Sequence, residues 1–163
     1  MSSVGSTRCC GRIASLHLMQ KGFYLKITEG PHSFLLASDD VISLQNKECL
    51  QVSSRRGGLA TACLVKKNTR WTAVRLAQML GFEAGDWAQA AFIETSDPVV
   101  GIMAERVHLI ENPPTGKIKP FTVVGSQAGG RSVYRGVRVG DGGPLVVLDR
   151  DGLKELVETV LDK

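Results

Sequence analysis

Residues 59–110 decide the fold, and they read LATACLVKKNTRWTAVRLAQMLGFEAGDWAQAAFIETSDPVVGIMAERVHLI. The apolar run at 59–65 predicts a strand. In residues 72–80, apolar side chains recur at the i, i+3, i+4 and i+7 spacing of a helix, and a glycine follows that can end it. Residues 87–94 and 99–110 predict two more strands around a proline-containing turn. The segment is therefore expected to run strand, helix, hairpin.

Strand patterns flank this segment on both sides. A second helix is expected over residues 152–161, where leucines and valines form one stripe and Asp151 can cap the start. Strands and helices do not alternate regularly, which argues against a doubly wound parallel sheet. The predicted fold class is α+β, a mainly antiparallel β-sheet with a short central helix and a C-terminal amphipathic helix. The flanking strands are expected at 12–19, 22–28, 34–37, 121–124, 132–139 and 145–148.

Glycine- and proline-rich stretches near residues 55–58 and 113–116 divide the chain into three segments. These are a β-rich segment at 1–58, the strand-helix-hairpin segment at 59–112, and a hairpin with a helix at 113–163. One compact domain formed by all three is the alternative. Residues 24–39 and 134–149 also match weakly without a gap, which is consistent either with an internal repeat or with two unrelated hairpins. A true repeat would pair the two ends of the chain around the central segment.

Composition indicates an ordinary globular protein, because 43% of the 163 residues are hydrophobic and 22% are charged. No apolar run is long enough for a membrane span or a signal peptide, so a cytoplasmic protein without membrane contact is expected. The cysteines and histidines lack the spacing of a zinc site, and no metal or other cofactor is expected. The net charge of +4 permits contact with nucleic acid without requiring it.

The central segment resembles the swapped-hairpin AbrB-type DNA-binding regulators. The resemblance covers about residues 59–110 and rests on the basic stretch Val65–Trp71, a short helix ending in Leu80-Gly81, and the turn Gly85-Asp86. The proline usual at the family's helix entrance is absent. The resemblance implies a DNA-binding, transcription-regulating homodimer, because a swapped hairpin completes its sheet with a partner's strands.

Two groups of residues are candidates for binding. Long cations between a strand and a helix can reach phosphates, and an amide can read a base edge. The nucleic-acid-binding candidates are Lys66, Lys67, Asn68, Arg70 and Arg75. Backbone N–H groups of a glycine-rich loop can instead hold a phosphate. The phosphate-binding candidates are Gly125, Ser126, Gly129, Gly130 and Arg131.

The sequence favours a non-enzymatic nucleic-acid-binding protein with a regulatory role. Two alternatives remain open at this point. One is a protein-interaction or structural module, and the other is a small-ligand or phosphate-binding enzyme that uses loop 125–132. No catalytic residue is assigned, because serine, carboxylate and histidine side chains do not form a recognisable arrangement in the sequence.

Overall fold

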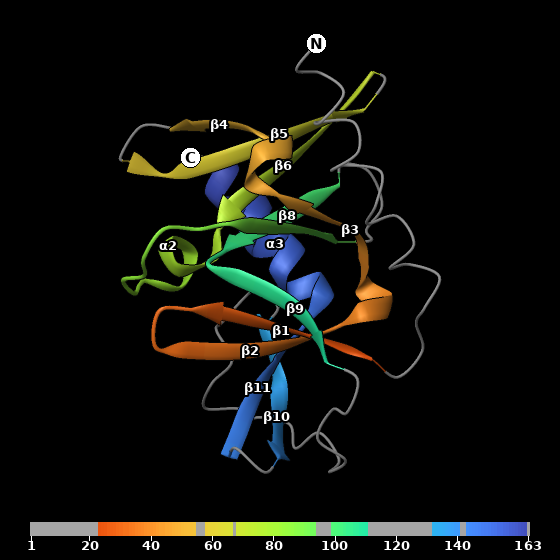
Figure 1. Cartoon of the computed structure of the whole chain (residues 1–163), viewed down its shortest axis with the longest axis vertical. Helices are drawn as coiled ribbons and strands as arrows, with labels where there is room; N and C mark the ends of the chain where they lie inside the picture. Colours follow the sequence, from red (N-terminus) through yellow and green to blue (C-terminus); the bar gives the residue numbers. More distant parts are fainter. Residues whose placement is uncertain are drawn as a thin grey trace.

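Two β-sheets packed on each other form most of the structure (Figure 1). This computed structural model describes residues 23–54, 58–66, 68–93, 99–110, 132–140 and 143–162. Sheet A has the strand order β10-β11-β2-β1-β9, and sheet B has the order β3-β7-β8-β6-β5-β4. The elements are β1 (Tyr24–Glu29), β2 (His32–Ala37), η2 (Ser38–Asp40), β3 (Val41–Asn46), η3 (Lys47–Cys49), β4 (Gln51–Ser54), β5 (Ala60–Lys66), β6 (Thr69–Arg75), α2 (Leu76–Leu80), β7 (Gln89–Ile93), β8 (Val100–Ala104), β9 (Arg106–Ile110), β10 (Tyr134–Gly140), β11 (Gly143–Leu148) and α3 (Arg150–Leu161). The expected α+β class is confirmed.

Alternation of apolar and polar residues forms the β1–β2 hairpin. Leu25 and Ile27 are buried, whereas the residues between them are partly exposed. The chain reverses at Gly30, whose φ of 57° is readily adopted by glycine. A Cβ at Gly30 would also lie 2.7 Å from the carbonyl oxygen of Glu83, in the loop after α2. Gly30 therefore serves both the turn and the close approach of that loop.

Strands β7 and β8 of sheet B are buried on both faces, and this explains why they are almost wholly apolar. All five residues of β8 are buried. On one face, residues such as Ile102 join a core shared with sheet A and α3. On the other face, Met103 and Phe92 join a second core formed with β5 and with the loop that carries Trp87. Strands β7 and β8 thus lie between two hydrophobic cores.

The second hairpin, β10–β11, lies beside the first one in sheet A. Strand β11 pairs in parallel with β2, through Val146 with Phe34 and Val147 with Leu35. This contact joins residues near the two ends of the described chain. A duplicated hairpin predicts such pairing, and the repeat itself stays a prediction.

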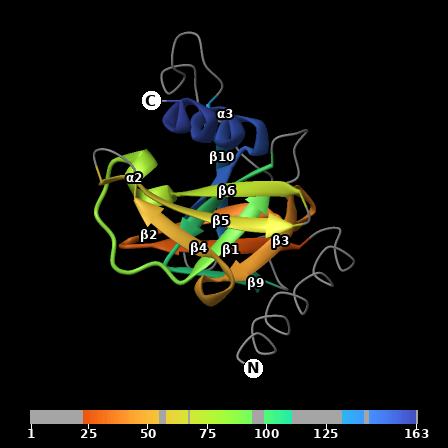
Figure 2. The same ribbon diagram turned by 90° about the horizontal axis from the view of Figure 1, so that it is seen from above.

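Helix α3 runs along one side of the molecule, opposite β9 in the view of Figure 2. Its buried residues Leu153 and Val157 belong to the core between the sheets. Asp149 caps the helix, because its carboxylate accepts a hydrogen bond of 2.8 Å from the N–H of Gly152. The cap expected at Asp151 is therefore wrong by two residues.

The central helix is shorter than the sequence indicates. It was expected over 72–80, but α2 begins at Leu76, and residues 69–75 form β6. Tertiary pairing overrides the helical spacing here, since β6 lies between β5 and β8 and bonds to both. The helix does end as expected, at Gly81 in the left-handed region with φ 82°.

The long strand expected over 99–110 is two strands in different sheets. The chain leaves sheet B after β8, turns at Glu105 and continues as β9 at the edge of sheet A. The strands expected at 12–19 and 121–124 lie outside the described residues. Among the helices that the structure describes, none combines the length and apolar character needed to span a membrane.

Candidate functional site

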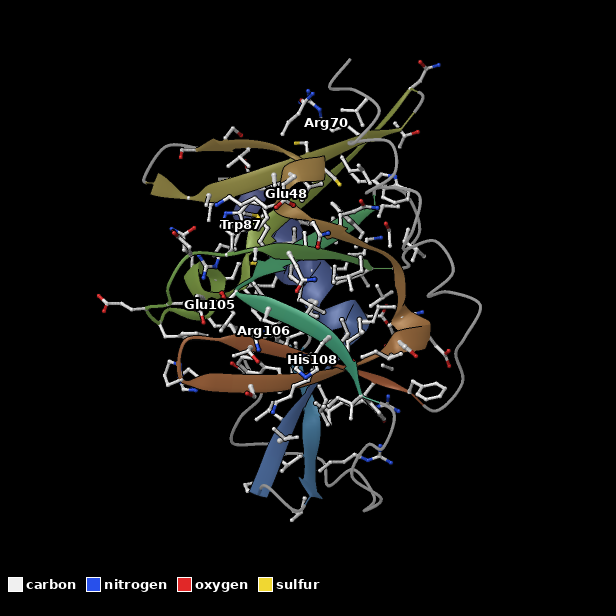
Figure 3. The ribbon with its side chains drawn as sticks, in the orientation of Figure 1. Glu48, Arg70, Trp87, Glu105, Arg106 and His108 are labelled. Carbon is white, nitrogen blue, oxygen red and sulfur yellow. The ribbon has the colours of Figure 1, made fainter. Side chains whose placement is uncertain are left out.

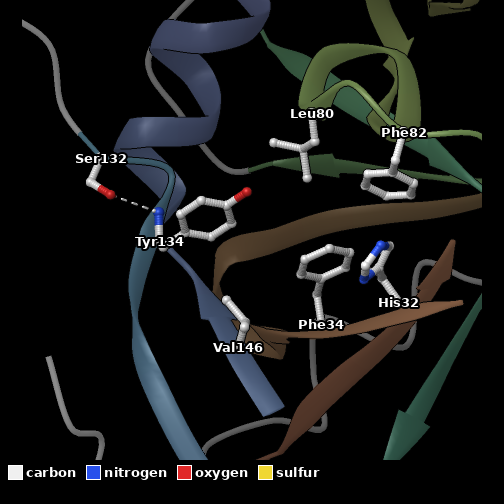
Figure 4. Close-up of a pocket in the computed structure, with 7 residues that line it drawn as sticks. All are labelled: His32, Phe34, Leu80, Phe82, Ser132, Tyr134 and Val146. Carbon is white, nitrogen blue, oxygen red and sulfur yellow. Dashed lines mark hydrogen bonds between the residues drawn. The ribbon is translucent and has the colours of Figure 1, made fainter. Parts of the chain in front are cut away.

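A pocket of about 430 Å³ opens between the start of β2 and the end of α2 (Figure 4). Three separate parts of the chain form it: strand β2, the end of α2 with the residue that follows its glycine, and hairpin β10–β11. This volume lies within the range of small-ligand and side-chain binding pockets. The residues that line this aromatic pocket are His32, Phe34, Leu80, Phe82, Ser132, Tyr134 and Val146.

Local geometry brings these side chains to one place. His32 and Phe34 are two residues apart on β2, so they share one face of the strand. Val146 joins that face because it pairs directly with Phe34. At the end of α2, the N–H groups of residues 81 and 82 both bond to the carbonyl oxygen of Ala77, which turns Phe82 towards the pocket.

Three rings form one wall of the aromatic pocket. The imidazole of His32 meets Phe82 edge-on, with ring centroids 4.5 Å apart. Phe34 lies 6.4 Å from Phe82 and 6.3 Å from His32, measured between centroids. These separations lie in the range in which aromatic rings attract one another through their quadrupoles. A wall of this kind favours another aromatic or aliphatic group as its occupant.

The opposite side of the pocket is more polar but carries no formal charge. The N–H of Tyr134 donates to Oγ of Ser132 over 3.1 Å, which fixes the start of β10 (Figure 4). Burial raises the pKa of the Tyr134 phenol above its ordinary value, so the ring stays neutral at physiological pH. None of the seven lining residues is a carboxylate, a lysine or an arginine. A charged occupant would lose its hydration without gaining a counter-ion there.

A buried ion pair fixes the loop that carries Phe82. The guanidinium of Arg75 donates to both carboxylate oxygens of Glu29, at 2.9 and 2.8 Å. Glu29 also accepts from the N–H of Ala77, at 2.7 Å, and from the N–H of Glu105, at 2.8 Å. Glu29 is fully buried, so every one of these bonds forms away from water. The ion pair therefore joins the end of β1 to β6, to α2 and to the turn between the sheets.

The same network reaches the middle of the loop between α2 and β7. Arg75 donates to the carbonyl oxygen of Gly85 over 2.6 Å, while the N–H of Gly85 donates to Glu105 over 2.5 Å. Glu105 in turn accepts from the N–H of Gly30 over 2.9 Å. The N–H and the carbonyl oxygen of Gly85 are thus both held by hydrogen bonds, and the loop that forms the pocket wall is preorganised.

The described members of the predicted nucleic-acid contacts lie in two different environments. Arg75 is 8% exposed and engaged with Glu29, so its guanidinium is not available to a phosphate. Asn68 and Arg70 are exposed near the β5–β6 turn, and Figure 3 places Arg70 at the opposite end of the molecule from hairpin β10–β11. Lys66 belongs to β5, but its side chain lies outside the described residues, as does the whole of Lys67.

The predicted phosphate loop also lies outside the described residues. This applies to Gly125, Ser126, Gly129, Gly130 and Arg131. Its last neighbour, Ser132, is described and lines the aromatic pocket. Within the described part of the chain, no group of three or more histidine, cysteine, aspartate or glutamate side chains could hold a metal ion.

The aromatic pocket itself was not predicted. His32 and Phe34 have the spacing of any two strand residues on one face, and Tyr134 carries no motif. The single hint was the match between residues 24–39 and 134–149, which indicated that two distant hairpins would meet.

No protein-family model matches the chain, and no curated protein matches it. Among solved structures, the fold is similar to that of the scaffolding protein TtCheW from Thermoanaerobacter tengcongensis. The TM-score is 0.60, the sequence identity is 10%, and the likeness covers 78% of this chain and 88% of that chain. The resemblance of residues 59–110 to AbrB-type regulators is not tested by this likeness and stays a prediction.

The expectation of a DNA-binding transcription regulator is corrected by this comparison. The fold is similar to that of a protein described as a scaffolding protein, and one of the expected DNA contacts, Arg75, is buried in an ion pair. The alternative of a protein-interaction module fits both findings better. At the level that the comparison supports, the chain has a CheW-like fold.

Proposed function

We propose that this chain is a protein-interaction module whose aromatic pocket receives an apolar side chain of a partner protein. The observation that carries the proposal is the fold, which is similar to that of a protein described as a scaffold. Fold alone does not determine function, so the proposal also needs a site with suitable chemistry.

The aromatic pocket supplies that chemistry. Its walls are mainly apolar and aromatic, they hold no carboxylate, lysine or arginine, and its volume of about 430 Å³ accommodates one large side chain together with flanking backbone. Aromatic side chains bury a large area at low entropic cost, and they are enriched among the residues that dominate protein–protein binding. An aromatic residue of the partner is therefore the expected occupant.

Preorganisation strengthens the case for binding. The ion-pair network of Glu29, Arg75 and Glu105 holds the loop that carries Phe82 before any partner arrives. A site that is already ordered loses less conformational entropy on binding. Self-association, expected from the AbrB-type resemblance, stays a separate prediction that light scattering can test against the chain mass of 17.6 kDa.

Photo-crosslinking in cells tests the proposal. A photoreactive phenylalanine analogue replaces Leu80, which is half-buried at the rim of the pocket, and a matched chain carries the analogue at Arg70, on the other sheet. We expect a protein adduct from position 80 that resists nuclease and is absent from position 70. Adding Val146→Glu, which introduces a charge into the pocket, should abolish that adduct, whereas Val146→Ile should keep it.

Two results would overturn the proposal. One is the absence of any protein adduct at position 80 in a chain that circular dichroism shows to be folded. The other is an adduct at position 80 that nuclease removes, because the occupant would then be a nucleic acid.

A further inference from the structure

The outer face of sheet A carries a second, chemically different surface. Lys26 of β1 pairs in register with His108 of β9, and Arg106 lies two residues from His108 on the same face. We call these three residues the basic strip. Arg106 and His108 are exposed and Lys26 is half-buried, and Figure 3 shows the two β9 residues near each other. Leu35, the next position across β1, is buried, so the exposed surface lies over β1 and β9.

The hydrogen bonds of β9 fix the spacing of the basic strip. The N–H of Val107 donates to the side-chain oxygen of Gln89 over 2.7 Å, so this amide points away from β1. Lys26 and His108 therefore form one of the hydrogen-bonded pairs of the antiparallel ladder, in which Cα atoms are about 5.5 Å apart. Arg106 and His108 are separated by two strand residues, or about 6.8 Å.

The basic strip has no counter-ion within the described part of the chain. None of its three side chains forms an ion pair or a hydrogen bond there. The carboxylates closest to the strip in the sequence bind elsewhere, since Glu29 faces the core with Arg75 and Glu105 binds the N–H groups of two glycines. Lys26 and Arg106 each carry a positive charge on this face, and a carboxylate of a bound partner would supply the counter-charge that the described residues do not.

We infer that the basic strip binds an extended acidic segment of a partner protein. Alternate side chains of an extended chain are about 6.8 Å apart, which matches the spacing of Arg106 and His108. Because Gln89 already occupies the N–H of Val107, the segment is expected to bind through its carboxylates rather than as an added strand. This inference rests on the protein-interaction function proposed above and names the chemistry of a second partner site.

The two sites lie on opposite faces of sheet A. Phe34, in the aromatic pocket, points to the face that carries Leu25 and Ile27, while Lys26 and His108 point to the other face. One chain can therefore hold an apolar side chain on one face and an acidic segment on the other. A scaffold needs this arrangement in order to bring two partners together.

A titration of the full-length ¹⁵N-labelled chain tests the inference. The probe is a short peptide of alternating glutamate and serine, and its control replaces every glutamate by glutamine. We expect the acidic peptide to shift the amide resonances of β1 and β9, the effect to weaken with added salt, and the glutamine peptide to have no effect. Arg106→Glu should weaken binding by about fivefold or more, while the equally exposed Arg70→Glu should leave it unchanged.

Three outcomes would overturn the inference: shifts outside β1 and β9, equal losses in the Arg106 and Arg70 variants, or tighter binding of a single-stranded oligonucleotide at the same amides. The titration does not use the aromatic pocket. Leu80→Glu should therefore bind the acidic peptide as the unmodified chain does. A loss of peptide affinity in Leu80→Glu as large as that in Arg106→Glu would also contradict the inference. A failed titration with a successful crosslink at position 80 would reject the basic strip alone.

Discussion

Replacing Glu29 by glutamine should destabilise the protein severely, although the change is nearly isosteric. The carboxylate is fully buried and accepts four hydrogen bonds, two from Arg75 and one each from the N–H groups of Ala77 and Glu105. A carboxamide keeps one acceptor oxygen and turns its NH₂ group towards the remaining donors. It also leaves the guanidinium of Arg75, which is 8% exposed, without a counter-charge.

The expected loss is about 3–5 kcal/mol, the range found when one partner of a buried ion pair is removed. A domain of this size is typically stable by about 5–15 kcal/mol, so Glu29→Gln removes a large fraction of the total. Urea denaturation followed through the fluorescence of Trp71 and Trp87 measures the change. A double-mutant cycle with Arg75→Met isolates the energy of the pair, because the double variant no longer buries an unpaired charge. The stability lost in the double variant should be smaller than the sum of the two single losses by about 2–3 kcal/mol. A loss below about 1 kcal/mol for Glu29→Gln, or strict additivity in the cycle, would refute this reasoning.

Four further substitutions test other parts of the structure. In a Tyr24→Phe variant, Tyr134 is the remaining tyrosine, so ultraviolet titration follows the ionisation of its phenol alone. Burial should place the midpoint of that titration above pH 10.0, and a midpoint at or below that value contradicts the burial. Burial raises the pKa of Asp40 even though Arg150 lowers it, so the folded state loses stability as pH rises through that pKa. The stability of Asp40→Asn relative to the unmodified chain should therefore increase from about pH 4 to about pH 7, and thermal unfolding that shows the opposite trend contradicts this sign. Gly152→Ala should lower the free energy of unfolding by about 1–3 kcal/mol, because the added Cβ would collide with the backbone of Ser132. Asp149→Ala, which removes the helix cap, should lower it by about 1 kcal/mol. A loss for Gly152→Ala milder than that for Asp149→Ala would contradict the close packing of α3.

Much of the secondary structure could be predicted because its causes are local. Alternation at Leu25 and Ile27 reports the buried face of β1, and the apolar stripe through Leu153 and Val157 reports the buried face of α3. Gly81 marks the end of α2 because a left-handed residue is needed there. In each case, the signal and the structure lie within a few residues of each other.

The errors arose where distant segments decide the structure. Residues 72–75 share the helical spacing of 72–80 but form the end of β6, because β5 and β8 supply hydrogen bonds on both of its edges. The role of Arg75 was misread for the same reason: its partner Glu29 is 46 residues away in the sequence, so a cation expected at the surface is buried. No property of the residues near Arg75 predicts this pairing.

The aromatic pocket was not predictable for a related reason. His32, Leu80 and Tyr134 come from three parts of the chain, and each has an ordinary local role in a strand or at a helix end. The contact between β2 and β11 brings Tyr134 near His32, and the close approach of the loop after α2 to Gly30 adds Leu80. A prediction of that contact, which the match of residues 24–39 with 134–149 already allowed, would have been the route to the site.

A side-by-side titration of two ligands tests the central claim most directly. The protein captured by the crosslinker at position 80 and a duplex DNA are each titrated, at two salt concentrations, into the unmodified chain, Leu80→Glu and Arg70→Glu. A protein-interaction module with an aromatic pocket predicts that the captured protein binds the unmodified chain and Arg70→Glu equally and loses affinity for Leu80→Glu, while DNA binds none of them appreciably. The claim would be contradicted by DNA binding that falls steeply with salt and is weakened by Arg70→Glu, together with equal affinity of the captured protein for all three chains.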